Sequence, residues 1–239
     1  MTVDRRIKLW SALVAHAGDG NVGLEHIGAT TVTVAGVTGV AITVRLPATP
    51  REAVYASDRV ATELEELILT LGEGPSVDAL VDGPVLVSDL ADAECAAQWP
   101  AFTDAAISAG VRALFSLPLR VGAVRLGVMD LYRDKPGALD HSQLADALVL
   151  ADTACALLLD GQSDGGPSGR YAPVRAGPHH PQVHQATGMI SVQLGVSIAV
   201  ALMRLRAYAY AHERRLGDVA ADVVARRLRF ESDATGGEK

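Results

Sequence analysis

Two arginine–tyrosine pairs stand near the C-terminal end of this 239-residue chain, Arg204 with Tyr208 and Arg206 with Tyr210. Residues four apart lie side by side on a helix, so each pair would place a cation beside an aromatic ring. Cations bind phosphates and rings stack on unpaired bases, and these are the contacts that recognise single-stranded RNA. The same pattern also suits a solvated helix face whose tyrosines pack in a core. Composition alone does not decide between these two interpretations.

The charge is distributed unevenly along the chain, which has a formal net charge of -7. Residues 1–181 carry 13 Lys and Arg against 22 Asp and Glu, whereas residues 182–230 carry 7 Arg against 3 acidic residues. The chain is therefore an acidic body with a basic C-terminal module. The net charge of the whole chain argues weakly against a nucleic-acid partner, but that sum hides the basic module.

The two cysteines, Cys95 and Cys155, form neither a disulfide framework nor a metal-ligand spacing. Cys95 lies in an acidic, Ala-rich segment, and neighbouring carboxylates raise the pKa of a thiol. Catalysis requires a nucleophile beside a base or paired titratable groups, and no spacing in the chain predicts either. We therefore expect no enzymatic activity and no cofactor. A reductase or ligand-modifying enzyme is the less favoured alternative.

Acidic and histidine residues elsewhere suggest capping and turns more than metal binding. Asp89 and Asp92 follow a predicted strand, where carboxylates most often cap the start of a helix. His179, His180 and His184 lie at the edge of a Gly- and Pro-rich segment, where polar turn residues are more common than metal ligands. No metal site is predicted.

The elements that position these groups follow from the hydrophobic periodicity. Helices are predicted over residues 3–17, 58–71 and 138–159. The first of them is expected to be amphipathic, with Ile7, Trp10, Leu13 and Val14 at helical spacing. Strands are predicted over residues 39–46, 85–87, 113–119 and 125–132, with a hairpin around Gly122. Residues 29–37 are rich in β-branched side chains and predict a strand locally, but they could also complete a helix begun near Val22. The fold class is α+β, with helices flanking a mixed or antiparallel sheet.

The composition is that of a folded protein, with 49% hydrophobic and 21% charged residues. No apolar run approaches the ~18 residues that a spanning helix needs. The first residues do not precede the apolar stretch of a signal peptide. We therefore expect a cytoplasmic protein with no membrane segment.

A segment rich in glycine and proline, residues 161–181, divides the chain and is interpreted as a linker. Three short helices are predicted in residues 182–230, over 183–194, 198–213 and 216–230, and a polar tail follows at 231–239. Gly195 should end the first helix and Ser197 should cap the second. So small a bundle has little core, so we expect support from a partner subunit.

Four motifs in the first 160 residues together resemble a GAF domain. They are GEGPSVDALVDGPVLVSDL at 72–90, WPAF at 99–102, GVRALFSLPLR at 110–120 and LGVMDLYRDKPGALD at 126–140. The resemblance implies a sensory domain over residues 1–160, with an antiparallel sheet flanked by helices and a pocket for a small-molecule ligand on one face. It also implies that residues 29–34 are helical.

The C-terminal module, residues 182–230, resembles an ANTAR domain through QATGM at 185–189, the later Ala201, Leu205 and Arg206, and LGDVA at 216–220. Together the two resemblances identify the chain with GAF and ANTAR domain-containing antitermination regulators of the actinobacterial type. They imply a homodimer whose ANTAR domains capture paired hairpins in leader RNA and so prevent formation of a transcription terminator.

The resemblance and the charge pattern together nominate the residues that contact RNA. They are Gln185, Thr187, Gly188, Arg204, Arg206, Tyr208, Arg214 and Arg215. Thr187 stands where the family often has lysine, and Ala207 where a second arginine is common, so affinity or hairpin choice could differ. A DNA-binding sensory regulator is the main alternative, because three short helices with a basic face also suit a helix-turn-helix.

Overall fold

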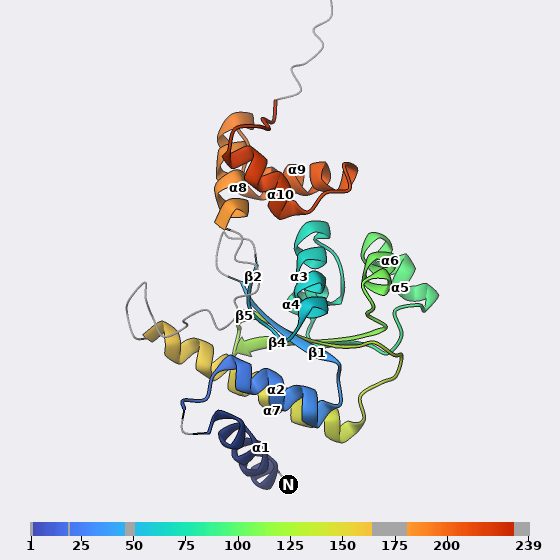
Figure 1. Cartoon of the computed structure of the whole chain (residues 1–239), viewed down its shortest axis with the longest axis vertical. Coiled ribbons are helices and arrows are strands. Elements are labelled where there is room, and N and C mark those ends of the chain that lie inside the picture. The colour runs from blue at the N-terminus through green and yellow to red at the C-terminus, as the bar shows by residue number, and fades with distance from the viewer. Residues whose placement is uncertain (1, 19, 46–50, 164–180, 232–239) are drawn as a thin grey trace, which may run out of the picture. The chain divides into compact units, whose positions relative to one another are not determined.

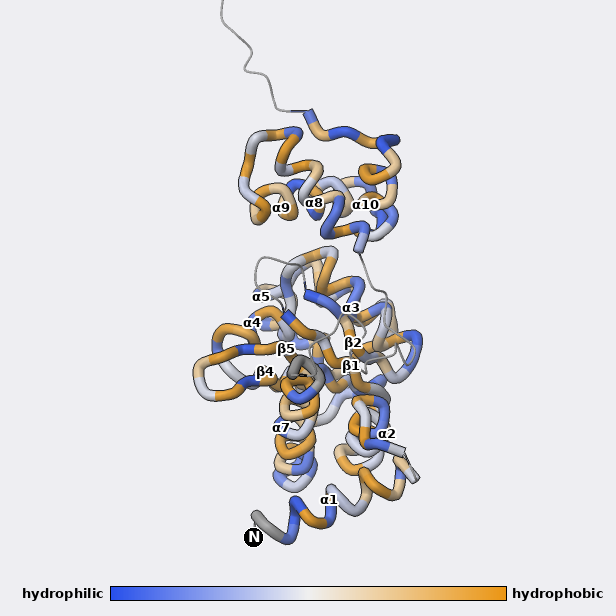
Figure 2. Tube along the Cα trace, turned by 90° about the vertical axis from the view of Figure 1, so that its left-hand side faces the viewer, coloured by the Kyte–Doolittle hydropathy of each residue, from blue (hydrophilic) through white to orange (hydrophobic). Residues whose placement is uncertain are grey.

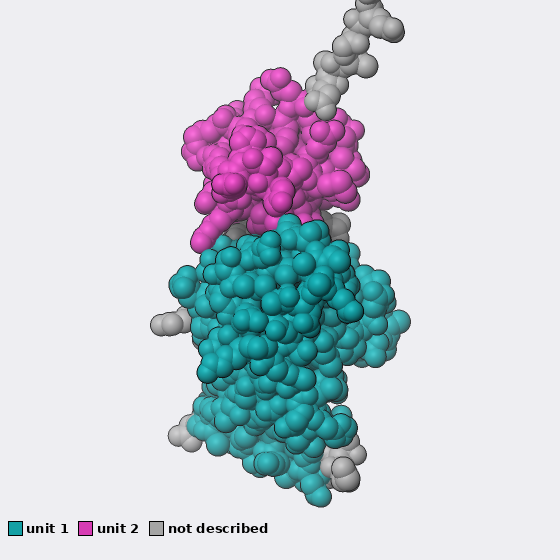
Figure 3. Space-filling view, turned by 90° about the vertical axis from the view of Figure 1, so that its right-hand side faces the viewer, with its two compact units in different colours: residues 1–45, 51–68, 73–179 teal, residues 46–50, 69–72, 180–239 magenta. Residues whose placement is uncertain are grey.

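The computed structural model describes residues 2–18, 20–45, 51–163 and 181–231, which Figure 1 colours along the chain. The chain forms two compact units, shown in separate colours in Figure 3. Residues 1–45, 51–68 and 73–179 make the N-terminal unit. Residues 180–239, together with 46–50 and 69–72, make the C-terminal unit. The predicted linker falls largely on residues 164–180 and the predicted tail on 232–239, so both lie outside the described residues.

The N-terminal unit is built on a five-stranded antiparallel sheet in the order β2-β1-β5-β4-β3 (Figure 1). The strands are β1 (Gly39–Val44), β2 (Glu52–Ala56), β3 (Val85–Val87), β4 (Ala113–Val121) and β5 (Val124–Arg133). Strands β4 and β5 form the expected hairpin, with Gly122 at a φ of 58° in its turn. The predicted α+β architecture is confirmed.

Helices cover both faces of this sheet (Figure 1). One face is covered by α2 (Leu24–Ala35) and α7 (His141–Ser163), with α1 (Thr2–Ala17) outside them. The helices α3 (Arg59–Leu71) and α4 (Pro75–Asp82) lie on the other face, and α5 (Ala93–Gln98) and α6 (Pro100–Ser108) follow β3. The larger apolar core lies between the sheet and α1, α2 and α7.

The ambiguous segment at 29–37 is helical, as part of α2, and its local strand propensity is overridden. Two threonines return their hydroxyls to the helix backbone, Thr31 to the Ile27 carbonyl at 2.7 Å and Thr33 to the Ala29 carbonyl at 3.1 Å. Leu24, Ile27 and Ala35 are buried at helical spacing. Burial of this face stabilises the helix more than β-branching disfavours it. Strand β2, which carries no strong apolar alternation, was not predicted.

The first helix forms as predicted, but its apolar residues do not all face inward. Leu9 and Leu13 are buried, whereas Ile7, Trp10 and Val14 are 60%, 52% and 43% exposed. The apolar residues of α1 occupy more of the helix surface than its contact with the rest of the domain can cover. One apolar stripe is therefore buried and a second apolar stripe is exposed. Figure 2 shows hydrophobic and hydrophilic residues following one another along this outermost helix.

The C-terminal unit contains α8 (Pro181–Leu194), α9 (Ile198–Ala211) and α10 (Leu216–Val224). Gly195 takes a φ of 63° after α8, and the Ser197 hydroxyl accepts a hydrogen bond from the Val200 N–H at the start of α9, as predicted. The third helix is shorter than expected, because Arg226 adopts a φ of 58° just beyond its end. A left-handed residue cannot continue a right-handed helix.

Within the described residues, α7 is long and apolar enough over His141–Asp160 to cross a membrane. The pair α8 and α9 passes the same test only as one broken span, bent by 106°. Ala147, Leu150, Ala154 and Leu158 of α7 are buried in the apolar core beside the sheet. The apolar composition of α7 therefore has an explanation in the fold.

Candidate nucleic-acid interface

The predicted contact residues on α8 have different environments. Gln185 is exposed and Gly188 is half-buried. A Cβ atom built on Gly188 would meet no atom within 4 Å, so this point of the helix faces open space. Gln185 and Gly188 are therefore positioned for an external partner to approach α8.

Thr187 is the exception, because the structure buries its side chain. Its side chain is 1% exposed and its hydroxyl donates to the Val183 carbonyl at 2.6 Å. One residue after Ala186 on the helix, it turns toward the core of the three-helix bundle instead of toward solvent. Its hydroxyl is already used within the helix, so Thr187 is not available to a phosphate.

On α9, Arg204 is exposed, Arg206 is half-buried and Tyr208 is half-buried. The Tyr208 ring stacks on His212 with centroids 3.9 Å apart and meets Phe230 edge-on at 5.5 Å. This ring therefore serves packing within the unit. The exposed aromatic ring of α9 is Tyr210, at 62%.

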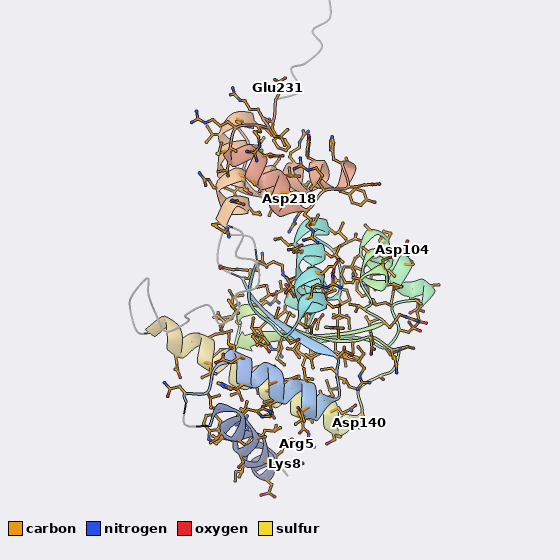
Figure 4. All side chains as sticks on the ribbon, viewed as in Figure 1. Arg5, Lys8, Asp104, Asp140, Asp218 and Glu231 are labelled. Carbon is orange, nitrogen blue, oxygen red and sulfur yellow. The ribbon has the colours of Figure 1, made fainter. Side chains whose placement is uncertain are left out.

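The turn between α9 and α10 carries Arg214 and Arg215, both exposed. Arg214 pairs with Asp222 at 2.7 Å, and Arg227 pairs with the same carboxylate at 2.6 Å. The two arginines hold the pKa of Asp222 below its ordinary value, and Asp222 raises that of Arg214. Much of the charge of Arg214 is thus already balanced. Figure 4 shows the side chains of this unit, with Asp218 and Glu231 on opposite sides of it.

Beside Gln185 lies a groove that the sequence did not reveal. It has a volume of about 730 Å³ and is lined by Gln185, Gly188, Met189, Val192, Gln193, Arg226 and Arg229. The first five residues form one stripe of α8, and the two arginines come from the segment after α10. The stripe on α8 could be predicted from the helical spacing of its residues. The position of the two arginines over it depends on the turn at Arg226, which the sequence did not predict.

A second set of polar residues, which the sequence analysis missed, is buried in the N-terminal unit. We call it the polar centre: Thr43, Arg51, Glu65, Ser76, Ser116 and Asp130. The strands supply Thr43, Ser116 and Asp130, α3 supplies Glu65, and α4 supplies Ser76. Ser116 and Asp130 face each other across β4 and β5. A carboxylate on the apolar side of α3 and another inside the apolar run of β5 were the signals available in the sequence.

Hydrogen bonds and ion pairs connect the polar centre. Asp130 accepts from the Ser116 and Ser76 hydroxyls, each at 2.5 Å, and lies 3.4 Å from the Arg51 Nη2 atom. Arg51 Nη2 also lies 3.3 Å from Glu65, which accepts from the Thr43 hydroxyl at 2.5 Å. One cation therefore faces two carboxylates away from water.

The polar centre is not fully satisfied by its own members. Arg51 Nε and Nη1 and Glu65 Oε1 are buried without a hydrogen-bond partner among the described residues. Burial, which outweighs the opposing charge of Arg51, raises the pKa of Glu65 from its ordinary 4.5 to about 7, and Asp130 adds to the rise. The charge of this site therefore changes near neutral pH.

The thiols differ from those of a reactive site. Cys95 and Cys155 are both buried and reduced. Burial raises the pKa of Cys95, and Asp92, Glu94 and Asp89 raise it further, so the predicted direction is confirmed. Burial also raises the pKa of Cys155.

The two aspartates near Cys95 differ in role. Asp89 accepts from the Ala91 N–H at 3.0 Å and pairs with Arg112 at 2.9 Å. Asp92 occupies the N-cap position of α5 without a side-chain hydrogen bond. In the described part of the chain, no group of three or more His, Cys, Asp or Glu is arranged to hold a metal ion, and His179 and His180 lie outside that part.

Comparison with known proteins gives two family matches. Residues 24–158 match the GAF domain and residues 175–224 match the ANTAR domain. No curated protein sequence matches the chain. The region matched as ANTAR ends before Arg226, so two of the groove's lining residues lie beyond it.

Solved structures with a similar fold include three sensory or GAF domains. A domain of a protein assigned as a two-component sensor histidine kinase from Sinorhizobium meliloti 1021 is 19% identical, with a TM-score of 0.49, covering 59% of this chain and 92% of that one. The GAF domain of a phosphoenolpyruvate-protein phosphotransferase from Coxiella burnetii is 10% identical, with a TM-score of 0.48 and coverage of 69% and 99%. GAF3 from Slr1393 of Synechocystis sp. PCC6803 is 13% identical, with a TM-score of 0.46 and coverage of 65% and 96%. These identities are too low to carry function across.

The domain content sets the kind of protein. A GAF domain is a sensory domain and an ANTAR domain is an RNA-binding antiterminator domain, so the pair indicates a regulatory, non-catalytic protein. The GAF match alone spans more than half of the 239 residues, and the chain belongs to the family of GAF and ANTAR domain-containing regulators.

Proposed function

We propose that this protein is a cytoplasmic transcription antiterminator that captures paired hairpins in nascent leader RNA, under the control of its GAF domain. The observation that carries the proposal is the exposed positive charge of the C-terminal unit, which contains the ANTAR domain. Arg204, Arg226 and Arg229 are exposed, and Gln185 lies exposed on the neighbouring helix. Exposed arginines can neutralise phosphates and stack on unpaired bases.

The contact residues that we propose are the predicted ones without Thr187 and Tyr208. Arg204 is the strongest candidate on α9 because it is exposed and one turn before Tyr208. Arg206 and Arg215 are retained as phosphate contacts. Arg214 is retained with a smaller contribution, because Asp222 already balances its charge. Tyr208 is retained as the support that packs His212 and Phe230 behind this surface.

Capture of two hairpins requires two ANTAR domains, so we propose a homodimer. Its interface is the exposed apolar stripe of α1, formed by Ile7, Trp10 and Val14. Arg5 projects from α1, as Figure 4 shows, and its ion pair with Asp146 at 3.3 Å helps hold α1 against α7. A second copy would bury this stripe against its own counterpart, as isologous dimers do.

The GAF domain is proposed to sense a small molecule on the side of the sheet that holds the polar centre. Among the described residues, two donor atoms of Arg51 and one acceptor atom of Glu65 have no hydrogen-bond partner there. Buried polar atoms favour a ligand that supplies the missing hydrogen bonds.

The RNA-binding proposal is tested with the full chain and an RNA of two stem-loops with randomised loops, from which the wild type selects its binders. Fluorescence anisotropy then compares the selected RNA with a DNA duplex of equal length at equal salt. We expect the RNA to bind more tightly, and Arg204→Ala to weaken it about five- to tenfold, as loss of a phosphate contact would. Arg125→Ala, which removes an exposed arginine from the GAF domain, serves as the control and should bind normally. Preference for the duplex would favour a DNA-binding regulator and overturn the proposal.

The dimer is tested by light scattering after size-exclusion chromatography. Trp10→Glu places a charge in the apolar stripe, so we expect a monomer that binds two-hairpin RNA at least tenfold more weakly. Binding of an RNA with one hairpin should not change. Lys8→Glu, a charge change at an exposed site of the same helix, should leave the dimer intact. A dimer that survives Trp10→Glu contradicts the proposed interface.

A further inference from the structure

We propose that the groove between α8 and the segment after α10 is a nucleotide subsite, which takes one unpaired RNA base against α8 and its phosphate against Arg226 and Arg229. The proposal rests on the proposed RNA-binding function and names the part of the surface that reads a loop nucleotide. It adds binding residues that neither the sequence analysis nor the ANTAR match includes.

The floor of the groove is apolar and open. The apolar side chains of Met189 and Val192 lie on the same stripe of α8, and Val192 is 84% exposed. Gly188 contributes no side chain, and the space above it is empty to 4 Å. Apolar side chains can pack against the flat face of a base, as they do in pockets that hold a flipped-out base. At about 730 Å³ the groove falls within the ~300–1,000 Å³ of small-molecule sites.

The rim of the groove is polar and basic. The Gln185 amide can donate to and accept from a base edge, the Gln193 NH2 group can donate to one, and both residues line the groove. Arg226 and Arg229 supply cations, and none of the described residues that line the groove is acidic. This combination favours an anionic nucleotide over the apolar segment of a protein partner, which would leave two guanidinium groups without counter-charges.

The two groove arginines differ from their neighbour Arg227. Arg227 is paired with Asp222, at 2.6 Å. Neither Arg226 nor Arg229 has an ion pair or hydrogen bond with another side chain in the described ranges, and both are exposed. Arg227 therefore has a structural role in this cluster, whereas Arg226 and Arg229 are available to bind an anion.

The segment that carries these arginines is held in place over α8. Arg226 has a φ of 58°, a conformation that costs a residue other than glycine about 1 kcal/mol or more. The Phe230 N–H donates to Gln193 Oε1 at 3.0 Å, and the Phe230 ring packs edge-on against Tyr208. The turn at Arg226 and the contacts of Phe230 together place both guanidinium groups beside the groove before any RNA binds.

The test uses the full chain and the two-hairpin RNA selected by the wild type. Arg226→Ala, Arg229→Ala and the double variant are compared with Arg227→Ala, which removes the same charge from the same segment but outside the groove. We expect a loss of about five- to tenfold for each groove variant, at least 30-fold for the double variant, and less than twofold for Arg227→Ala. The slope of log affinity against log salt should fall in magnitude by about one per groove arginine, as for a lost phosphate contact.

An abasic scan of the RNA loops locates the bound base. At one loop position, removal of the base should weaken binding by the wild type. Removal of the same base should have little effect on binding by Gly188→Leu, because the leucine side chain already fills the groove. Three results overturn the proposal while leaving RNA binding by the domain intact: equal losses for all three single arginine variants, no loss in the double variant, or no base whose effect depends on Gly188. If groove variants keep RNA affinity but lose the dimer, the groove is a protein contact and the proposal is also wrong. If the wild type selects no RNA, the proposed function itself fails.

Discussion

The two domains use charged side chains in opposite ways. In the GAF domain, Arg51, Glu65 and Asp130 meet in a buried cluster, where one cation faces two carboxylates. In the C-terminal unit, Arg204, Arg226 and Arg229 are exposed. The buried set can respond only to something small enough to enter or to a proton, whereas the exposed set can contact a large polyanion.

The difference has an energetic basis. A buried charge without a partner costs several kcal/mol, so the members of the polar centre depend on one another. An exposed arginine costs little, and its interaction with a phosphate is screened by salt. Loss of one buried charge should therefore destabilise the GAF domain. Loss of one exposed arginine from the C-terminal unit should instead lower the affinity for RNA.

The largest effect is expected for Asp130→Asn. This change removes a buried carboxylate that Ser116, Ser76 and Arg51 all contact, so we expect a loss of about 2 to 4 kcal/mol in the free energy of unfolding. Urea unfolding followed by tryptophan fluorescence measures it, because both tryptophans of the chain lie in the N-terminal unit. Asp134→Asn, at an exposed site, should change stability by about 0.5 kcal/mol or less. Equal losses at the two positions would show that burial is not the cause.

The next effect is a pH dependence at Glu65. Its raised pKa means that the folded protein keeps a proton that the unfolded chain loses above about pH 4.5. The stabilisation is complete below that pH and is lost as pH rises through about 7. Glu65→Gln cannot lose a proton, so relative to wild type it should gain about 2 to 3 kcal/mol between pH 4.5 and 7.5. Urea titrations at several pH values measure this difference, and a constant difference across the range would contradict it.

A smaller effect is expected at Gly188. Glycine inside a helix is less stable than alanine by about 0.5 to 1 kcal/mol, and a Cβ atom here meets no neighbour. Gly188→Ala should therefore slow amide hydrogen exchange along α8 about two- to fivefold, as measured by mass spectrometry. Faster exchange would mean that the helix is not packed as described.

The smallest effect is expected at Thr187, the buried member of the predicted contact set. Thr187→Val removes a hydroxyl whose hydrogen bond, within the described part of the chain, goes to the Val183 carbonyl, which also takes part in the helix. RNA affinity should stay within twofold of wild type. Gln185→Ala on the same helix should lower it more, because Gln185 is exposed and lines the groove. A larger loss at Thr187 than at Gln185 would reverse this assignment of the two side chains.

Much of the fold could be predicted from periodicity and motifs. The hairpin of β4 and β5 and the three C-terminal helices follow from local pattern, because their residues contact neighbours close in sequence. Strand β2 could not be predicted, since its pairing with β1 and not its composition makes it a strand. The third helix ended early because Arg226 is left-handed, and no residue type there signals such a turn.

The candidate sites, like the fold, have features that the sequence predicts and features that depend on tertiary contacts. Residue types and their order were sufficient for the two families, for the basic character of the C-terminal module and for the raised pKa of Cys95, because these depend on composition and on near neighbours. Tertiary structure alone decided that Thr187 is inside, that Ile7 and Trp10 are outside, and that Arg51 meets Asp130, 79 residues away. Helical spacing limits which residues share a face, but the direction that a face takes depends on what packs against it. That information arises only when distant segments of the chain come together.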